Sequence, residues 1–153
     1  MSDVLSVGQI APDFSLMNQD RKVVTLAELR GKRVVLLFYP MDFSPTCTEE
    51  HCAFGPALGT IAADVKTVVF GINCDHSFSH AAYKKQFNIP YDLLSDTSRA
   101  TVKAYGMYWG LEPFNAAQRG TVVVDEAGRI SHWSQVEIGD HRSVESIAQA
   151  ARE

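Results

Sequence analysis

Six consecutive apolar residues, Val34–Tyr39, constrain the fold of this chain more than any other segment. A strand with one face in water alternates apolar and polar residues, whereas a run that is apolar at every position is typical of a strand covered on both faces. The segment after it, Pro45 to about Ala63, has a helical pattern, and Thr67–Ile72 is a second β-rich run. This part of the chain therefore predicts strands that alternate with helices around a buried sheet.

The other expected elements extend this pattern. In chain order they are a hairpin of Phe14–Leu16 and Val23–Thr25, a helix that Ser77 caps and that ends before Pro90, a short helix near Ser98–Tyr105, an irregular aromatic segment Met107–Phe114, a hairpin of Thr121–Val124 and Ile130–Trp133, and a last helix that Ser143 caps. The order predicts an α/β, thioredoxin-like fold, with a central mixed β-sheet flanked by helices and an N-terminal β-hairpin. Because no internal repeat or Gly/Ser linker interrupts it, we expect residues 1–153 to form a single domain.

Composition and charge argue against several classes of function. The formal net charge of -4 provides no basic surface for nucleic acid, and no Lys/Arg run suggests binding to a membrane surface. The longest apolar runs have the length of strands and are far too short to span a bilayer. The start of the chain, Met1–Val4, lacks the basic-then-apolar plan of a signal peptide. These features predict a cytoplasmic protein, in which the three cysteines are kept reduced.

One of those cysteines, Cys47, lies where a strand is expected to turn into a helix. Ser44 is a good N-cap residue and Pro45 suits the first helical position, so Cys47 falls within the first turn. The unpaired N–H groups and partial positive charge of a helix N-terminus favour a thiolate over a thiol. A single cysteine is more often a small buried hydrophobe, but this position favours a reactive group.

The residues around Cys47 also carry a family resemblance. The segment Pro40–Cys47, PMDFSPTC, resembles the peroxiredoxin signature of a proline, three residues, Thr or Ser, two residues and a cysteine. Ala11–Leu16 and Leu29–Lys32 upstream, and Arg119–Thr121 downstream, are similar to further segments of that family in the same order. The resemblance implies a thioredoxin fold and a thiol-dependent peroxidase that reduces hydrogen peroxide and organic hydroperoxides through Cys47.

Four further residues have roles that suit this chemistry. Arg119 is the implied donor that stabilises the thiolate and the charge developing on the departing oxygen. Ser44 offers its hydroxyl to the peroxide, or serves only as the helix cap, and Pro40 shields the thiolate from water. Glu50, three residues after Cys47, shares its helical face and either orients an arginine or is a solvated surface residue.

A second cysteine, Cys52, lies five positions after Cys47, a spacing that resembles the bacterioferritin-comigratory or Q-type peroxiredoxins. This implies that Cys52 resolves the sulfenic acid of Cys47 as an intramolecular disulfide. In an intact helix the two Cα atoms lie roughly 8.5 Å apart, whereas a disulfide requires less than about 7 Å. We therefore predict that the first turns of this helix, from Ser44 to about Cys52, unwind on oxidation. Cys74 remains open as an alternative resolving cysteine.

No flavin or nicotinamide motif is present, so no cofactor is expected, and thioredoxin or a glutaredoxin-like dithiol is the implied reductant. The Q-type resemblance favours a monomer over a dimer.

Three other functions remain open. The chain is a metal carrier if Cys47, His51 and Cys52 bind Cu(I), with or without His76 or His80. It is a thioredoxin-type protein oxidoreductase if the two cysteines act on protein disulfides, although that function normally uses C-x-x-C. A third alternative is a non-catalytic holdase or interaction module.

Overall fold

The computed structural model describes residues 5–153, except for the side chains at positions 56 and 62. Its elements in chain order are β1 (Ser15–Met17), β2 (Val23–Thr25), the 3-10 helix η1 (Leu26–Leu29), β3 (Arg33–Phe38), α1 (Pro45–Ala62), β4 (Thr67–Asn73), α2 (Ser77–Phe87), β5 (Asp92–Ser95), α3 (Ala100–Ala104), β6 (Tyr108–Trp109), β7 (Ala116–Ala117), β8 (Arg119–Val124), β9 (Ile130–Val136) and α4 (Val144–Arg152).

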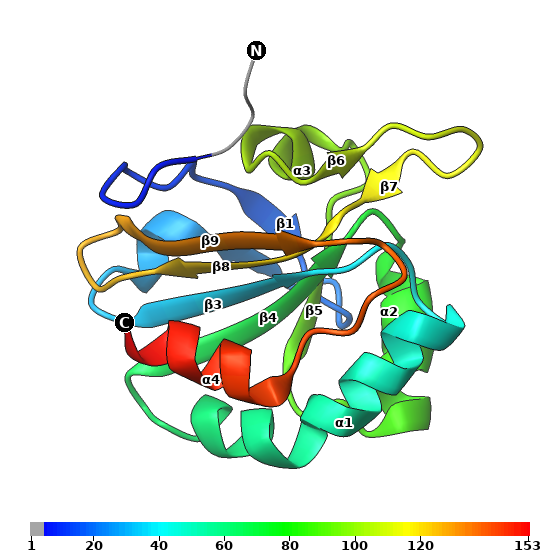
Figure 1. Cartoon of the computed structure of the whole chain (residues 1–153), viewed down its shortest axis with the longest axis horizontal. Coiled ribbons are helices and arrows are strands. Elements are labelled where there is room, and N and C mark those ends of the chain that lie inside the picture. The colour runs from blue at the N-terminus through cyan, green and yellow to red at the C-terminus, as the bar shows by residue number, and fades with distance from the viewer. Residues whose placement is uncertain (1–4) are drawn as a thin grey trace.

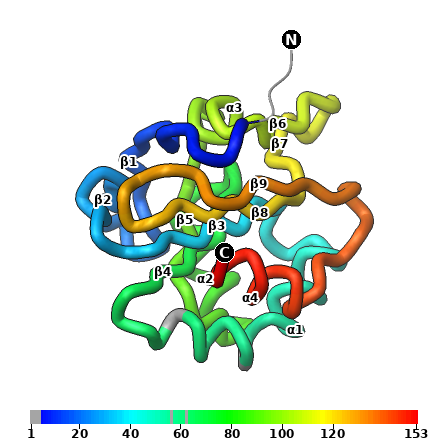
Figure 2. The backbone as a smooth tube through the Cα atoms, turned by 60° about the vertical axis from the view of Figure 1, so that its left-hand side comes forward, coloured from blue at the N-terminus to red at the C-terminus, as the bar shows by residue number. Residues whose placement is uncertain are grey.

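One mixed sheet organises the chain. Its strand order is β2-β1-β5-β4-β3-β8-β9, in which β3, β4 and β5 run parallel and the other pairings are antiparallel. Helices α1, α2 and α4 lie on one side of this sheet, and α3 with the β6–β7 hairpin lies on the other (Figure 1). In the turned view of Figure 2, α4 at the end of the chain lies beside α1, with which it is in contact. The predicted central mixed sheet flanked by helices is confirmed.

Strand β3 lies between two hydrophobic cores, as its unbroken apolar run predicts. Val34, Leu36 and Phe38 belong to the core beneath η1 and α3. Val35 and Leu37 point to the opposite face, where they pack with residues of α1, α2 and α4. The period-2 alternation of side chains in a strand distributes an all-apolar run between both faces. Polar side chains would therefore be excluded from either face of β3.

Most predicted elements form within a residue or two of their expected bounds. The N-terminal hairpin pairs Ser15 with Thr25, and Ser143 caps α4 by accepting a hydrogen bond from the N–H of Ser146. The expected cap of α2 was wrong, because Ser77 is already helical and His76 holds the N-cap position without a side-chain hydrogen bond.

Two further corrections concern strands. Strand β5 was not predicted, because Leu93 and Leu94 form too short an apolar run between polar neighbours to give a pattern. The segment Met107–Phe114 is not wholly irregular, since Tyr108 and Trp109 pair antiparallel with β7. Strand β5 gains its hydrogen bonds from β4 and β1, which are distant in sequence, so local patterns do not indicate it.

The close packing around β4 leaves no space for a side chain at Gly71. A Cβ atom at this position would approach a methyl group of Leu93 to 2.6 Å and the ring of Tyr39 to 3.2 Å. We expect Gly71→Ala to lower the free energy of unfolding by about 1–3 kcal/mol, because the core has no room for the methyl group. Urea denaturation measures the change. Gly139→Ala is the matched control, since its Cβ would meet open space, and equal effects of the two substitutions would contradict the packing described.

Candidate active site

The loop between β3 and α1 places Cys47 in the interior at the start of a helix. Pro40 is buried just after β3, and α1 begins at Pro45. Ser44 is the N-cap, and its hydroxyl accepts a hydrogen bond from the backbone N–H of Cys47 at 3.3 Å. The side chain of Cys47 is fully buried. The hydroxyl proton of Ser44 is not used by this cap, so capping and donation to a ligand are compatible.

Arg119 reaches Cys47 from the neighbouring strand. Strand β8 pairs Gly120 with Phe38 at the end of β3, so Arg119 lies just beyond that end, beside the start of α1. Its Nη2 donates to the Sγ of Cys47 at 3.2 Å, and its Nε donates to the carbonyl oxygen of Ile138 at 3.0 Å. The guanidinium is thereby held in one orientation, with one edge against the sulfur.

Glu50 lies between Arg119 and a second arginine, Arg142. The Oε1 atom of Glu50 accepts from Nη1 of Arg119 at 2.6 Å and from Nη2 of Arg142 at 3.0 Å. Its Oε2 atom accepts from Nε of Arg142 at 3.0 Å and from the backbone N–H of the same residue at 2.7 Å. All three side chains are nearly or completely buried. We refer to Arg119, Glu50 and Arg142 as the arginine–glutamate cluster.

The charges of this cluster favour an anion at Cys47. Two guanidinium groups and one carboxylate leave one positive charge in a buried space, where charges interact more strongly than in water. Burial alone would lower the pKa of Arg119, but the attraction of Cys47 and Glu50 outweighs it and raises that pKa. Burial likewise opposes ionisation of Glu50, but hydrogen bonds and charge from Arg142, together with Arg119, lower its pKa. A thiolate at Cys47 would neutralise the remaining positive charge.

Arg142 was not among the predicted site residues. It lies in the loop just before the Ser143 cap of α4, where an arginine is ordinarily solvated. In the fold it extends over the ring of Phe54 on α1 and also donates to the carbonyl oxygen of Gly120 on β8. No local sequence signal indicates this burial, which arises because α4 packs beside α1.

A buried carboxylate supports the loop that carries Pro40 and Ser44. The side chain of Asp42 accepts four hydrogen bonds, from Tyr39 at 2.6 Å, His80 at 2.7 Å, Ser79 at 2.8 Å and Asn73 at 3.2 Å. Burial raises the pKa of Asp42, but these hydrogen bonds and the charge of His80 outweigh it and lower the pKa. The donors come from β4, α2 and the end of β3, so the loop is fixed to three parts of the fold. Sequence reasoning did not identify this network.

The remaining cysteines lie in different surroundings. Cys52 is exposed on α1, in the same continuous helix as Cys47, and all three cysteines are free. Cys74 is half-buried just after β4, where burial first and the nearby Asp96 second raise the pKa of its thiol to about 12. Such a thiol is almost entirely protonated at neutral pH and is a poor nucleophile.

The residues of the proposed metal carrier do not converge. Cys47 faces Arg119, Cys52 faces solvent, and the ring of His51 is enclosed by aromatic side chains. Within residues 5–153 no group of three or more His, Cys, Asp or Glu side chains is arranged to hold a metal ion.

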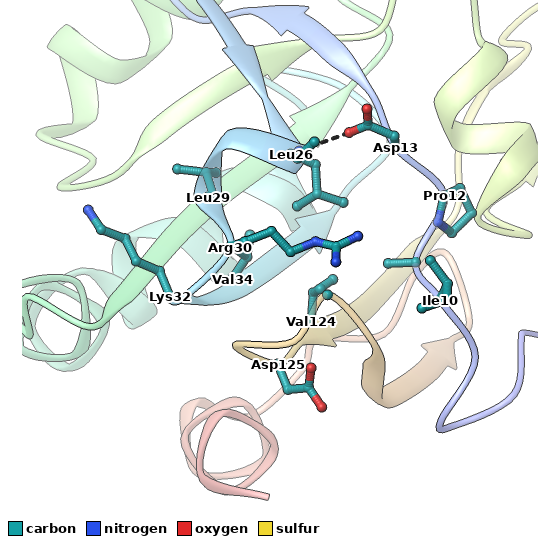
Figure 3. A pocket seen from close by; sticks show the side chains of 13 residues that line it. Ile10, Pro12, Asp13, Leu26, Leu29, Arg30, Lys32, Val34, Val124 and Asp125 are labelled. Carbon is teal, nitrogen blue, oxygen red and sulfur yellow. Dashed lines mark hydrogen bonds between the residues drawn. The ribbon is translucent and has the colours of Figure 1, made fainter.

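A separate pocket of about 360 Å³ lies at the other end of β3 (Figure 3). Ile10 and Leu26 contribute apolar surface, and the guanidinium of Arg30 lies across the opening. Asp13 accepts a hydrogen bond from the backbone N–H of Ala27, and Arg30 donates to the carbonyl oxygen of Ala127. None of the residues predicted to carry chemistry lines this pocket.

Comparison with known proteins identifies the family of this chain. The model of the AhpC/TSA family matches residues 7–133. Peroxiredoxin Bcp of Bacillus subtilis is 32% identical over 143 residues, which cover 90% of each protein. The chloroplastic peroxiredoxin Q of Triticum aestivum is 36% identical over 131 residues, which cover 84% of this chain and 58% of the relative.

Solved structures of peroxiredoxins share the fold. The peroxidoxin BcpB of Mycobacterium tuberculosis has a TM-score of 0.82 and 26% identity, with 97% of each chain covered. The reduced 2-Cys peroxiredoxin of Plasmodium vivax has a TM-score of 0.83 and 29% identity, covering 97% of this chain and 81% of the other. The chain therefore belongs to the AhpC/TSA family. Its relatives include peroxiredoxins of the Bcp and Q types, so the predicted resemblance and the thioredoxin-like fold are confirmed.

We expect the arginine–glutamate cluster to contribute to the stability of the fold. Arg142→Ala removes a charged partner and two of the four hydrogen bonds of the buried carboxylate of Glu50, and we expect a loss of about 3–5 kcal/mol in the free energy of unfolding at pH 7. Urea denaturation is the measurement. Arg152→Ala, at the exposed end of α4, is the control and should change the same quantity by less than about 0.5 kcal/mol. Similar values for the two variants would show that the buried contacts of Arg142 contribute little.

Proposed function

We propose that this protein is a thiol-dependent peroxidase that reduces hydrogen peroxide and organic hydroperoxides at Cys47. The thiolate attacks the terminal oxygen of the peroxide, the O–O bond breaks, and Cys47 becomes a sulfenic acid. The leaving alkoxide or hydroxide takes up a proton and departs as an alcohol or water. The sulfur loses two electrons and the peroxide gains them. The contact of Arg119 with the sulfur of Cys47 carries this proposal.

The surroundings of the sulfur support this chemistry. The fixed guanidinium of Arg119 can stabilise both the thiolate and the charge that develops on the departing oxygen. Glu50 is the positioning residue that fixes this guanidinium. The hydroxyl of Ser44, already directed toward the first turn of α1, is the proposed donor to the bound peroxide, and Pro40 limits the access of water. None of these steps requires a cofactor.

Cys52 is the proposed resolving residue. Its thiolate attacks the sulfenic sulfur of Cys47, a disulfide forms, and the sulfenic oxygen leaves as water. Both residues lie in the unbroken helix α1, in which their Cα atoms are roughly 8.5 Å apart, too far for a disulfide. The first turns of α1 must therefore unwind between oxidation and disulfide formation. The exposure of Cys52 supports its accessibility to Cys47 once the helix opens.

The remaining parts of the proposal concern the setting of the reaction. Thioredoxin or a glutaredoxin-like dithiol is the proposed reductant of the Cys47–Cys52 disulfide, and the protein is proposed to act as a cytoplasmic monomer without nucleic-acid or membrane partners. The net charge of -4 supports the absence of a nucleic-acid surface. Among residues 5–153 no helix is both long and apolar enough to cross a bilayer.

Peroxide consumption driven by a thioredoxin system tests these roles in three cysteine variants. Cys47→Ser should abolish turnover, because no other thiol has the same charged surroundings. Cys52→Ser should still react once with peroxide but lose recycling by thioredoxin. Cys74→Ser should retain at least about half of the wild-type rate, because its thiol is protonated at neutral pH.

Mass spectrometry of the peroxide-treated wild type provides the structural control. The expected product is a peptide pair joined through Cys47 and Cys52. A pair joined through Cys47 and Cys74 would reassign the resolving residue, and full turnover by Cys47→Ser would refute the proposed nucleophile.

A further inference from the structure

His51 occupies an enclosed aromatic site on the buried side of α1. Its ring centroid lies 4.5 Å from that of Tyr39, 5.7 Å from Tyr83, 5.8 Å from Tyr91 and 6.1 Å from Phe54. These rings come from the end of β3, from α2, from the segment before β5 and from α1 itself. Only 2% of the surface of His51 is exposed. We refer to these four aromatic residues as the His51 cage.

The cage leaves one polar atom of His51 without a partner. Its Nδ1 is hydrogen-bonded to the hydroxyl of Tyr91, whereas its buried Nε2 has no hydrogen-bond partner. A neutral ring tolerates this arrangement, but an imidazolium would have a charged N–H directed into an apolar space. The cage therefore holds His51 in its neutral form.

The charges that face His51 agree with this interpretation. Burial is the largest effect and the charge of Arg142 the second, and together with weaker contributions they lower the pKa of His51 to about 3. The titratable and charged groups that face its ring from the surrounding elements are Glu50 on α1, Tyr39 after β3, Asp42 in the following loop, Tyr83 on α2, Tyr91 before β5, Arg119 on β8 and Arg142 before α4. Glu50 and Asp42 oppose the shift but do not cancel it.

His51 also lies within the segment that must open. Cys47 and Cys52 approach each other only if the helical backbone between them rearranges, and His51 is part of that backbone. Its side chain cannot remain in the cage while the residues on either side leave the helix. Unwinding therefore transfers His51 from an apolar enclosure to water.

We propose that His51 is a positioning residue that holds the first turns of α1 helical, and that mild acid releases it and thereby promotes the opening needed for the Cys47–Cys52 disulfide. The link between His51 and disulfide formation rests on the proposed function. The pH-sensitive opening of α1 is independent of the proposed function, because it depends only on the contacts of His51.

The direction of the effect follows from proton linkage. The closed helix keeps His51 neutral down to about pH 3, whereas the opened segment lets it titrate near its ordinary pKa of 6.5. Between these values the open form binds more protons, so the closed form loses stability as the pH falls through this range. The opening constant should be about tenfold higher at pH 5.5 than at pH 7.5.

The two buried carboxylates near the start of α1, Glu50 and Asp42, do not reproduce this change. The ordinary pKa values of Glu50 and Asp42, 4.5 and 3.8, lie below the range tested, and the fold lowers both. His141 contacts Glu49 on α1 at 3.1 Å, and the variants below retain both residues of this exposed contact. The variants below also retain Cys47. Any effect of this residue on the opening of α1 is therefore the same in wild type and variants.

Amide hydrogen exchange of the reduced full-length protein tests the proposal at pH 5.5 and 7.5. The amides of residues 48–52 report opening of the first turns of α1, after correction for the intrinsic pH dependence of exchange. The variants are His51→Asn, which retains a polar group near Tyr91 but cannot titrate, and His51→Phe, which fills the cage with an apolar ring. If His51→Asn leaves α1 open at both pH values, the comparison of wild type with His51→Phe decides the outcome.

The wild type should show the tenfold increase in opening at acid pH, whereas both folded variants should change by less than about twofold. A purely structural role of His51 would alter the level of exchange without altering its pH dependence. Equal pH ratios in wild type and His51→Phe would overturn the proposal, as would wild-type opening that does not respond to pH.

A second measurement connects opening with disulfide formation. After oxidation by one equivalent of hydrogen peroxide, the rate of Cys47–Cys52 disulfide formation is compared between wild type and His51→Phe at each pH. Effects of pH that are common to both proteins cancel in the ratio of wild type to His51→Phe, which should rise about tenfold from pH 7.5 to 5.5. A constant ratio would refute the link to the disulfide. If neither protein forms a disulfide, the proposed resolution step fails, and the exchange data alone decide the role of His51.

Discussion

The contact between Arg119 and Cys47 depends on a buried charge arrangement contributed by three distant parts of the chain. Cys47 and Glu50 come from the first turns of α1, Arg119 from the start of β8 and Arg142 from the loop before α4. None of these charged groups would be stable in the interior alone, because an unpaired buried charge is strongly unfavourable. The cluster therefore requires the sheet, α1 and α4 to be packed together before it can form.

The first turns of α1 must be helical to position Cys47 and must open for the disulfide with Cys52 to form. The cap by Ser44, the Asp42 network and the aromatic surroundings of His51 all favour the helical form, in which Cys47 faces Arg119. Disulfide formation with Cys52 requires the opposite, because the intact helix keeps the two cysteines apart. Turnover thus needs a helix that is stable enough to position the sulfur and weak enough to open. Polar and titratable groups at its buried face suit this requirement better than a wholly apolar core.

The sequence indicates the parts of this arrangement that local patterns encode. The apolar run of β3, the Ser44–Pro45 helix start, the position of Cys47 and the helical spacing of Glu50 each follow from neighbouring residues, and the family resemblance added Arg119 as an expectation. Arg142, Asp42 and the burial of His51 were not predicted. Each is a polar residue with at least one hydrogen-bond partner more than 30 positions away, so its environment is set by packing. Strand β5 was missed for the same reason, since its neighbours in the sheet define it.

The central claim is that a rigid, correctly oriented guanidinium at Cys47 accounts for its reaction with peroxide. The most direct test is the second-order rate constant for oxidation of Cys47 by hydrogen peroxide in Arg119→Lys, measured in a single turnover at pH 7.5. Lysine retains the positive charge but cannot contact Cys47, Glu50 and the carbonyl oxygen of Ile138 together. The account predicts a rate constant at least about tenfold below that of the wild type. A folded Arg119→Lys protein that reacts at the wild-type rate would contradict it.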